Sequence, residues 1–249
     1  MSGRLAWLGQ ARGRGFFSHL PDHLVEALVD GSHPLEYPAG AVWFGWDERA
    51  VPTLVLSGSL RLFVTNADGC QLTLRYLGVG DLLGWTNLKT PRAVQVLDEA
   101  RVLILDPNRQ RMLTEKEPAI AAALREETRR GIDELLRMSC VRAFGSIRTR
   151  VASAIMEQAK AAGSFHEGGA VAGTHEELAT AIGSVREVVG SALQAMKKEG
   201  LVKTHRGGVV ILKPQRLEAV AAGGLGPAEP YRSDWAPKVK SRVSINTAS

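Results

Sequence analysis

A short polar run in the last third of the chain, SVREVVGSAL, carries side chains suited to chemistry with nucleic-acid bases. Arg186 and Glu187 are neighbours where a helix is expected to begin, so both would project from its first turns. In the DNA major groove an arginine can donate two hydrogen bonds to guanine O6 and N7, and a glutamate can accept one from the cytosine amino group. The pair therefore predicts direct reading of base edges.

Polar residues around this pair fit the same use. Ser184, Val185 and Ser191 would share the exposed face of that helix. Thr174, Ser184 and Arg206 would contact backbone phosphates, and such contacts position a protein on DNA without specifying sequence. We therefore predict a double-stranded DNA partner bound by seven residues: Thr174, Ser184, Val185, Arg186, Glu187, Ser191 and Arg206.

Two successive helices must position these side chains, after a glycine-rich loop at residues 163–173. Thr174 with Glu177, and Ser184 with Glu187, have the spacing of capping boxes, which mark helix starts. A glycine between the two helices supplies the turn. Their inner faces are predicted from a set of apolar residues: Leu178, Ile182, Val188, Val189, Leu193 and Met196. The pattern is typical of a helix-turn-helix.

A hairpin follows, because residues 201–204 and 209–212 are short β segments joined by His-Arg-Gly-Gly, and a last short helix covers 214–222. Helix-turn-helix plus hairpin predicts a winged helix DNA-binding domain over 146–222. Residues 142–216 also carry 11 Lys and Arg against 6 Asp and Glu, whereas the preceding 141 residues carry 16 against 17. A local basic surplus favours a partner with a phosphate backbone.

A long helix is predicted upstream, at 117–143, from apolar residues at spacings of three and four. A helix of this length needs a partner surface. We predict a dimer seam, and packing of the stripe on the chain's own barrel is the alternative. Gly145 breaks the helix and Ser146 is expected to cap the next one. The stripe and the residues that widen it are Ile120, Leu124, Ile132, Leu135, Leu136, Met138 and Val141.

The part of the chain before this helix is β-rich. Short runs of Val, Leu, Ile and Thr, separated by glycine turns, predict strands at 41–44, 53–56, 59–65, 70–77 and 100–105. In SLRLFVT, Arg61 shares one strand face with the apolar Phe63. Many short strands predict a barrel, which can enclose a ligand or be filled by its own side chains.

The predicted fold class is therefore α+β: an effector-sensing β-barrel domain at 16–116, the long dimerisation helix, and the C-terminal winged helix. Residues 223–249 are predicted to be a disordered tail, because their apolar residues are isolated among Gly, Pro, Ser and charged residues.

Three sequences, GDLLGWTNLKTPRAVQV, AFGSIRTRVA and SVREVVGSAL, together resemble the Crp/Fnr family of bacterial transcription regulators over roughly residues 16–220. The resemblance implies a cyclic-nucleotide-binding-like jelly-roll barrel, a homodimer on palindromic DNA, and contact with RNA polymerase. The family's recognition helix usually reads the half-site with an Arg-Glu pair, matched here by Arg186 and Glu187. Ser191 replaces a further basic residue one turn on, so we expect a base preference relaxed or changed from the common TGTGA type.

The same resemblance locates an effector pocket at Gly84, Trp85, Arg92 and Leu135. Cyclic-nucleotide-binding members have a glutamate after the glycine, which holds the ribose hydroxyl, and a Ser or Thr after the arginine, which helps hold the cyclic phosphate. Here Trp85 and Ala93 replace them. An indole cannot accept a hydroxyl hydrogen bond, so a buried ribose hydroxyl would be left unpaired at a cost of roughly 1–3 kcal/mol. We predict no cyclic-nucleotide binding; a cyclic-nucleotide-activated regulator is the alternative.

Residue types argue against most cofactors. With only Cys70 and Cys140, the chain has neither a disulfide framework nor the four cysteines of an iron–sulfur cluster. Haem ligation through His19, His23, His33 or Cys70 is an alternative that no motif supports. We therefore predict no cofactor and no metal site.

An enzyme is not predicted either. A metal enzyme with a barrel of the cupin kind would need barrel histidines, and residues 34–106 contain none, so no catalytic residue is assigned. Neither a long apolar run nor a signal peptide is evident, which predicts a cytoplasmic protein without membrane contact. A ligand-sensing module whose winged helix binds a protein partner is the remaining alternative to DNA binding.

Overall fold

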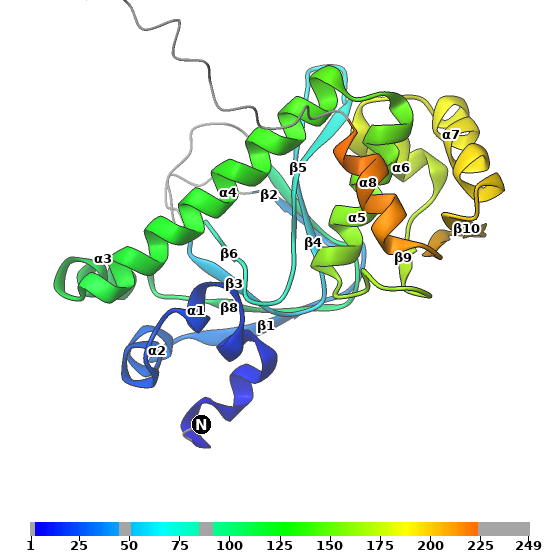
Figure 1. Cartoon of the computed structure of the whole chain (residues 1–249). Helices are drawn as coiled ribbons and strands as arrows, with labels where there is room; N and C mark the ends of the chain where they lie inside the picture. Colours follow the sequence, from blue (N-terminus) through cyan, green and yellow to red (C-terminus); the bar gives the residue numbers. More distant parts are fainter. Residues whose placement is uncertain (1–2, 45–50, 85–91, 224–249) are drawn as a thin grey trace, which may run out of the picture.

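A β-barrel makes up the first half of the described chain, and a long helix and a C-terminal module follow it (Figure 1). The computed structural model describes residues 3–44, 51–84 and 92–223 of the 249 residues. Two four-stranded antiparallel sheets form the barrel, with strand orders β1-β8-β3-β6 and β2-β7-β4-β5. The strands are β1 (His33–Tyr37), β2 (Val42–Phe44), β3 (Thr53–Ser57), β4 (Leu60–Thr65), β5 (Gln71–Leu77), β6 (Leu82–Leu83), β7 (Ala93–Val96) and β8 (Ala100–Ile104).

The five predicted strands all form, with each end within one residue of its predicted place. Strands β1, β6 and β7 are not among them. Strand β1 is almost wholly exposed and contains a proline, and β6 is two residues long, so neither shows the apolar alternation of a half-buried strand. The sheets join distant segments, since Leu35 of β1 pairs with Val102 of β8.

Three short helical segments precede the barrel and complete its core: η1 (Gly3–Gly13), α1 (Gly15–Ser18) and α2 (Asp22–Val29). Gly15 has φ +54°, and a Cβ there would lie 2.0 Å from the carbonyl oxygen of Gly80, so only glycine fits this approach. The core therefore includes residues before 16. It brings together buried residues of these segments and of the barrel: Leu5, Leu8, Phe16, Phe17, Leu54 and Leu103.

Two helices, α3 (Pro107–Lys116) and α4 (Pro118–Phe144), connect the barrel to the C-terminal module. Figure 1 shows α4 running along the barrel toward that module. Ile132, Leu135 and Leu136 are exposed on α4. Packing on the chain's own barrel therefore accounts for only part of the predicted stripe and leaves an uncovered apolar face. The buried apolar residues of α4 are Ile120, Ala123, Leu124, Met138 and Val141.

The C-terminal module combines helices with a three-stranded sheet of order β10-β11-β9. Ser146 caps α5 as predicted, since its hydroxyl accepts a hydrogen bond from the Thr149 N–H at 3.1 Å. The prediction of a loop throughout residues 163–173 is wrong, because Ala170–Ala172 form strand β9, which pairs with β11. A strand of three residues is too short to show a recognisable alternation of apolar and polar side chains. The other elements are α5 (Ile147–Ala161), α6 (His175–Ile182), α7 (Arg186–Lys198), β10 (Val202–His205), β11 (Gly208–Ile211) and α8 (Pro214–Ala222).

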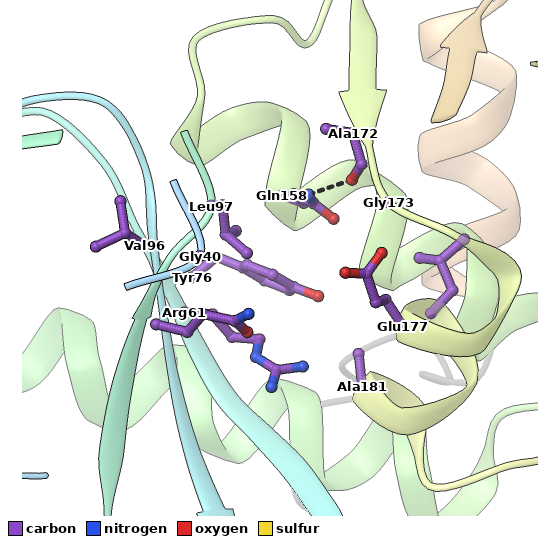
Figure 2. Close-up of a pocket in the computed structure, with 12 residues that line it drawn as sticks. Gly40, Arg61, Tyr76, Val96, Leu97, Gln158, Ala172, Gly173, Glu177 and Ala181 are labelled. Atoms are coloured by element: carbon purple, nitrogen blue, oxygen red, sulfur yellow. Dashed lines mark hydrogen bonds between the residues drawn. The ribbon is translucent and has the colours of Figure 1, made fainter. Parts of the chain in front are cut away.

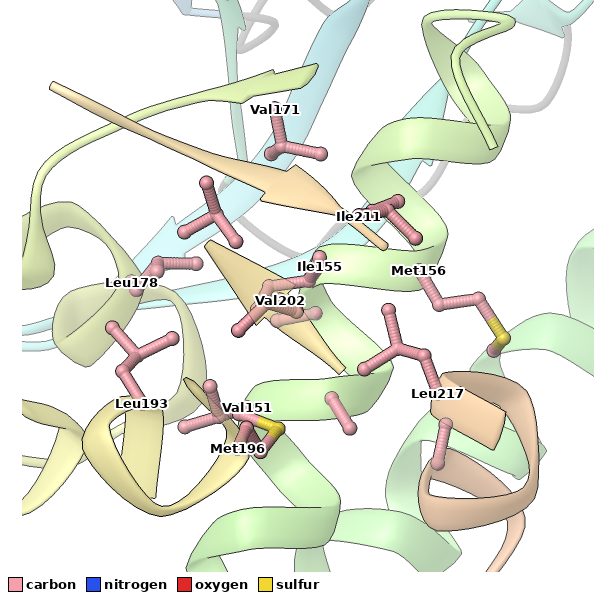
Figure 3. Packing of buried hydrophobic residues seen from close by; sticks show 14 of the residues in the cluster. Val151, Ile155, Met156, Val171, Leu178, Leu193, Met196, Val202, Ile211 and Leu217 are labelled. Atoms are coloured by element: carbon pink, nitrogen blue, oxygen red, sulfur yellow. The ribbon is translucent and has the colours of Figure 1, made fainter. Parts of the chain in front are cut away.

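One buried apolar cluster holds this module together (Figure 3). It joins α5, α6, α7, the sheet and α8 through residues that include Val151, Ile155, Leu178, Leu193, Met196, Val202, Ile211 and Leu217. The cluster supports α7 from its inner face and leaves the opposite face of that helix open. The predicted disordered tail lies outside the described residues apart from Gly223. Among the described helices, none combines the length and apolar character of a membrane-spanning segment.

Candidate nucleic-acid interface and effector pocket

The first helix of the predicted helix-turn-helix begins at the predicted capping box. The Glu177 N–H donates to Thr174 Oγ1 at 3.2 Å, and the Thr174 N–H donates to Glu177 Oε2 at 2.6 Å. These reciprocal bonds satisfy two of the free N–H groups at the start of α6. Thr174 nevertheless remains exposed, so its predicted contact with a phosphate is sterically open.

The predicted second capping box, Ser184 with Glu187, is wrong. Val185 is the N-cap residue of α7, and no side chain caps this helix start. Ser184 belongs to the end of α6 instead, because its N–H donates to the Ala179 carbonyl at 2.9 Å after Gly183 adopts a left-handed conformation at φ +66°. The end of α6 thus delays the start of α7 by one residue.

The N-terminal turns of α7 present a mostly polar face. Val185, Arg186, Glu187 and Ser191 are exposed, and no ion pair or side-chain hydrogen bond holds Arg186 or Glu187 among the described residues. Val188 was predicted on the inner face, which is wrong: it is 39% exposed and lies beside this polar face. The other predicted inner residues are buried: Leu178, Ile182, Val189, Leu193 and Met196.

The hairpin turn brings the last predicted contact residue close to the start of α6. Arg206 and Gly207 form the turn between β10 and β11, and Arg206 is exposed. The Gly173 N–H donates to the Gly207 carbonyl at 2.9 Å, so the wing turn lies beside the segment that leads into Thr174. Thr174 and Arg206, distant in sequence, therefore lie near each other next to the helix-turn-helix.

A buried ion cluster between the barrel and α4 was not predicted. Arg75 of β5 contacts Glu134 and lies 3.4 Å from Glu127, while Arg130 contacts Asp81 at 2.6 Å and Glu127 at 2.5 Å. Glu127 is only 4% exposed. Glu127, Arg130 and Glu134 recur at helical spacing on one side of α4, which is the one sequence signal that could have indicated them.

The pKa values of this cluster reflect burial and charge together. Burial raises the pKa of Glu134, and the neighbouring Arg75 opposes this only in part. For Arg130, burial lowers the pKa, but Asp81 and Glu127 outweigh it and the net pKa is raised. These ion pairs therefore hold α4 against the barrel, because they join Arg75 and Asp81 to side chains of that helix.

The predicted effector pocket is only partly described. Gly84 has φ +71°, and a Cβ there would lie 2.2 Å from the Val51 carbonyl oxygen. Trp85 lies outside the described residues. Arg92 is half-buried just before β7, and Leu135 is exposed on α4. None of the described three lines either of two cavities that lie beside α6.

The larger cavity, of about 130 Å³, lies instead on the seam between the barrel and α6 (Figure 2). Arg61 and Tyr76 line it from the barrel, and Gln158 and Glu177 line it from the C-terminal module. Burial lowers the pKa of Arg61, and burial raises the pKa of Tyr76. The signal for this site in the sequence is Arg61, a cation on the same strand face as Phe63.

Comparisons with known proteins agree with this arrangement. Residues 149–220 match the family model described as a Crp-like helix-turn-helix domain. A cyclic AMP receptor protein of Thermus thermophilus is 30% identical over 218 residues, which cover 85% of this chain and 99% of that protein. A second relative from Thermus thermophilus is named as a transcriptional regulator; it is 28% identical over 169 residues, which cover 67% of this chain and 82% of that protein.

Solved structures show the same fold. A CRP/FNR-family transcriptional regulator from Thermus thermophilus is 25% identical with a TM-score of 0.64, over 76% of this chain and 98% of that one. A regulator of the same family from Eubacterium rectale is 22% identical with a TM-score of 0.65, over 83% of this chain and 97% of that one.

Proposed function

Because the chain belongs to the Crp/Fnr family of DNA-binding transcription regulators, we propose that it acts as a homodimer on palindromic promoter sites. CRP-family regulators bind DNA and act as dimers. The observation that carries the proposal is the open face at the start of α7, where Arg186 and Glu187 are exposed without an intramolecular partner among the described residues. We also propose contact with RNA polymerase once the dimer is bound.

Each part of the chain has a role in this proposal. Residues 16–116 form the sensor barrel, 117–143 the dimerisation helix, and 146–222 the DNA-binding domain. In that domain Arg186 and Glu187 read base edges. The remaining predicted residues contact phosphates or lie against the major groove. The accessibility of these remaining residues supports the assignment, since Thr174, Val185, Ser191 and Arg206 are exposed and Ser184 is half-buried.

The dimer proposal rests on α4. Ile132, Leu135 and Leu136 form an exposed apolar face on a helix of 27 residues. A second copy of the same helix would cover this face in the manner of a two-stranded coiled coil. Two winged helices held in this way would present two copies of α7 to successive turns of one DNA face, which matches a palindromic site.

We expect selection from a randomised DNA pool by the purified full-length protein, without added effector, to enrich a palindrome with half-site centres about 10 base pairs apart. Arg186→Ala should weaken binding to that site by about 1–3 kcal/mol per half-site and relax the preference at the contacted base. Titration of labelled duplex at fixed salt measures both effects.

Arg109→Ala is the matched control, because Arg109 pairs with Asp30 at 2.7 Å on the barrel side of the molecule and should not affect DNA binding. If Arg186→Ala selected the same motif with the same affinity, the assigned role of α7 would be wrong. Absence of any salt-dependent DNA binding would favour the protein-partner alternative.

We also propose that the barrel does not bind a cyclic nucleotide, so cyclic AMP is expected to give no saturable micromolar heat in a calorimetric titration. Trp85 replaces the glutamate that would accept the ribose hydroxyl, and the apolar Leu135 stands on α4 where polar base contacts would be needed. Several relatives are named for cyclic AMP, among them the cyclic AMP receptor protein of Thermus thermophilus and a cAMP-activated regulator of Mycobacterium tuberculosis. Saturable cyclic AMP binding would establish the alternative, a cyclic-nucleotide-activated regulator.

A further inference from the structure

The cavity between the barrel and α6 holds a buried cation that forms no ion pair with any described residue, although Glu177 across the cavity attracts it at longer range. Arg61 is 6% exposed, and no carboxylate among the described residues lies within ion-pair distance of it. Its Nη2 donates to the side-chain oxygen of Gln71, its guanidinium lies 4.5 Å over the Phe63 ring, and its Nε has no hydrogen-bond partner in the described part of the chain. A buried charge left this way is costly, and an anion in the cavity would offset that cost.

The opposite wall carries the complementary charge. Glu177 faces the cavity from α6, and Figure 2 shows Arg61, Tyr76 and Glu177 directed toward the space between the two modules. Both hydrogen bonds of Thr174 to this carboxylate use Glu177 Oε2, and no described residue bonds to Oε1. The Tyr76 hydroxyl stays protonated, because burial raises its pKa, and so can donate to an anion.

Size restricts what can bind. A volume of about 130 Å³ is close to that of an engineered protein cavity of about 150 Å³ that takes benzene, so about six or seven non-hydrogen atoms fit. One wall supplies a cation and the other a carboxylate that do not contact each other. A ligand that satisfies both must carry a negative group at one end and a positive group at the other.

We propose that this cavity is an effector site for a small zwitterion the size of an α-amino acid. Its carboxylate would bind Arg61 and the Tyr76 hydroxyl, and its ammonium group would bind Glu177 Oε1. Because the walls come from the barrel and from α6, a bound ligand stabilises this arrangement of the two modules relative to others. The effector role depends on the proposed DNA-binding function, whereas ligand binding does not.

The test is isothermal titration calorimetry of the full-length protein with glycine, L-alanine, L-serine and γ-aminobutyrate, and with acetate and ethylamine as single-charge probes. At least one zwitterion should bind saturably and about tenfold or more tighter than acetate or ethylamine, because only a zwitterion satisfies both walls. Arg61→Met and Glu177→Gln should each weaken that binding about tenfold or more.

Both variants are chosen to keep the fold. Methionine retains an unbranched chain on the Phe63 ring, and glutamine preserves the capping box with Thr174. Arg109→Met is the matched control outside the cavity and should bind like the wild type. Unfolding curves of all variants establish that loss of binding is not loss of structure.

Three results would overturn the site: no saturable zwitterion binding, equal binding of acetate, or unchanged binding by both cavity variants. The effector role is measured separately, as a shift of about fivefold or more in the Kd for the selected palindrome when the zwitterion is added, absent in Arg61→Met. A ligand that binds without shifting this Kd would overturn the effector role. Failure of the DNA selection itself would leave the calorimetric result intact, so the two proposals fail independently.

Discussion

Replacing Leu136 with glutamate is expected to convert the dimer into a monomer and to weaken binding to a full palindromic site by roughly 10²- to 10⁴-fold. Leu136 is 60% exposed on α4 beside Ile132 and Leu135, and these residues form the proposed dimer interface between two copies of α4. Each copy would bring one unpaired carboxylate into that interface, where burial of a charge is strongly unfavourable. A monomer binds only one half-site and therefore loses the increase in affinity that comes from linking two DNA-binding domains.

Sedimentation equilibrium and duplex titration measure the two effects. Binding to an isolated half-site should change little, because Arg186 and Glu187 are untouched. Leu35→Glu is the matched control, since Leu35 is also an exposed leucine, at 43%, but lies on strand β1 of the barrel. If Leu136→Glu remained dimeric at the protein concentrations at which the wild type is dimeric, the assignment of α4 as the dimer interface would be wrong.

Replacing Arg75 with methionine is expected to lower the free energy of unfolding by about 3–5 kcal/mol. Arg75 contacts Asp81, Glu127 and Glu134. Without it, Arg130 still pairs with Asp81 and Glu127, whereas Glu134 has no ion pair left among the described residues. Removing one partner from a buried ion cluster leaves the remaining charges desolvated and uncompensated. The loss is therefore much larger than that of a surface pair.

Chemical denaturation of the wild type and the variant measures this difference. Arg129→Met is the control: Arg129 is 61% exposed and pairs with Glu126 and Asp133 on the same helix, so its loss should cost less than about 1 kcal/mol. The deficit of Arg75→Met should shrink as the pH falls. Burial already raises the pKa of Glu134 and Arg75 lowers it, so without Arg75 this carboxyl takes up its proton at a higher pH and its charge disappears. Equal losses in Arg75→Met and Arg129→Met would contradict the role of the cluster.

The winged helix was predictable because its signals are local. The Thr174–Glu177 capping box, Gly183 and the hairpin turn each depend on residues within a few positions of one another, so short-range backbone preferences define them. The start of α7 was misplaced by one residue for the same reason. Two overlapping local signals compete at Ser184, and the hydrogen bond to Ala179 decides in favour of the end of α6.

The α+β class, the five main barrel strands, the long helix, the helix-turn-helix with its Arg186–Glu187 pair and the family resemblance could all be predicted from the order of residues. Three features emerge only from the folded chain: which part of the α4 stripe is covered, the contacts of Arg75 with Glu127 and Glu134, and the position of Arg61 opposite Glu177 across a cavity. The difference lies in how far apart the interacting residues are in the sequence. Periodicity and capping act within a few residues, whereas each of these charge arrangements joins side chains more than fifty residues apart, and only the packing of the barrel against the helices brings them together.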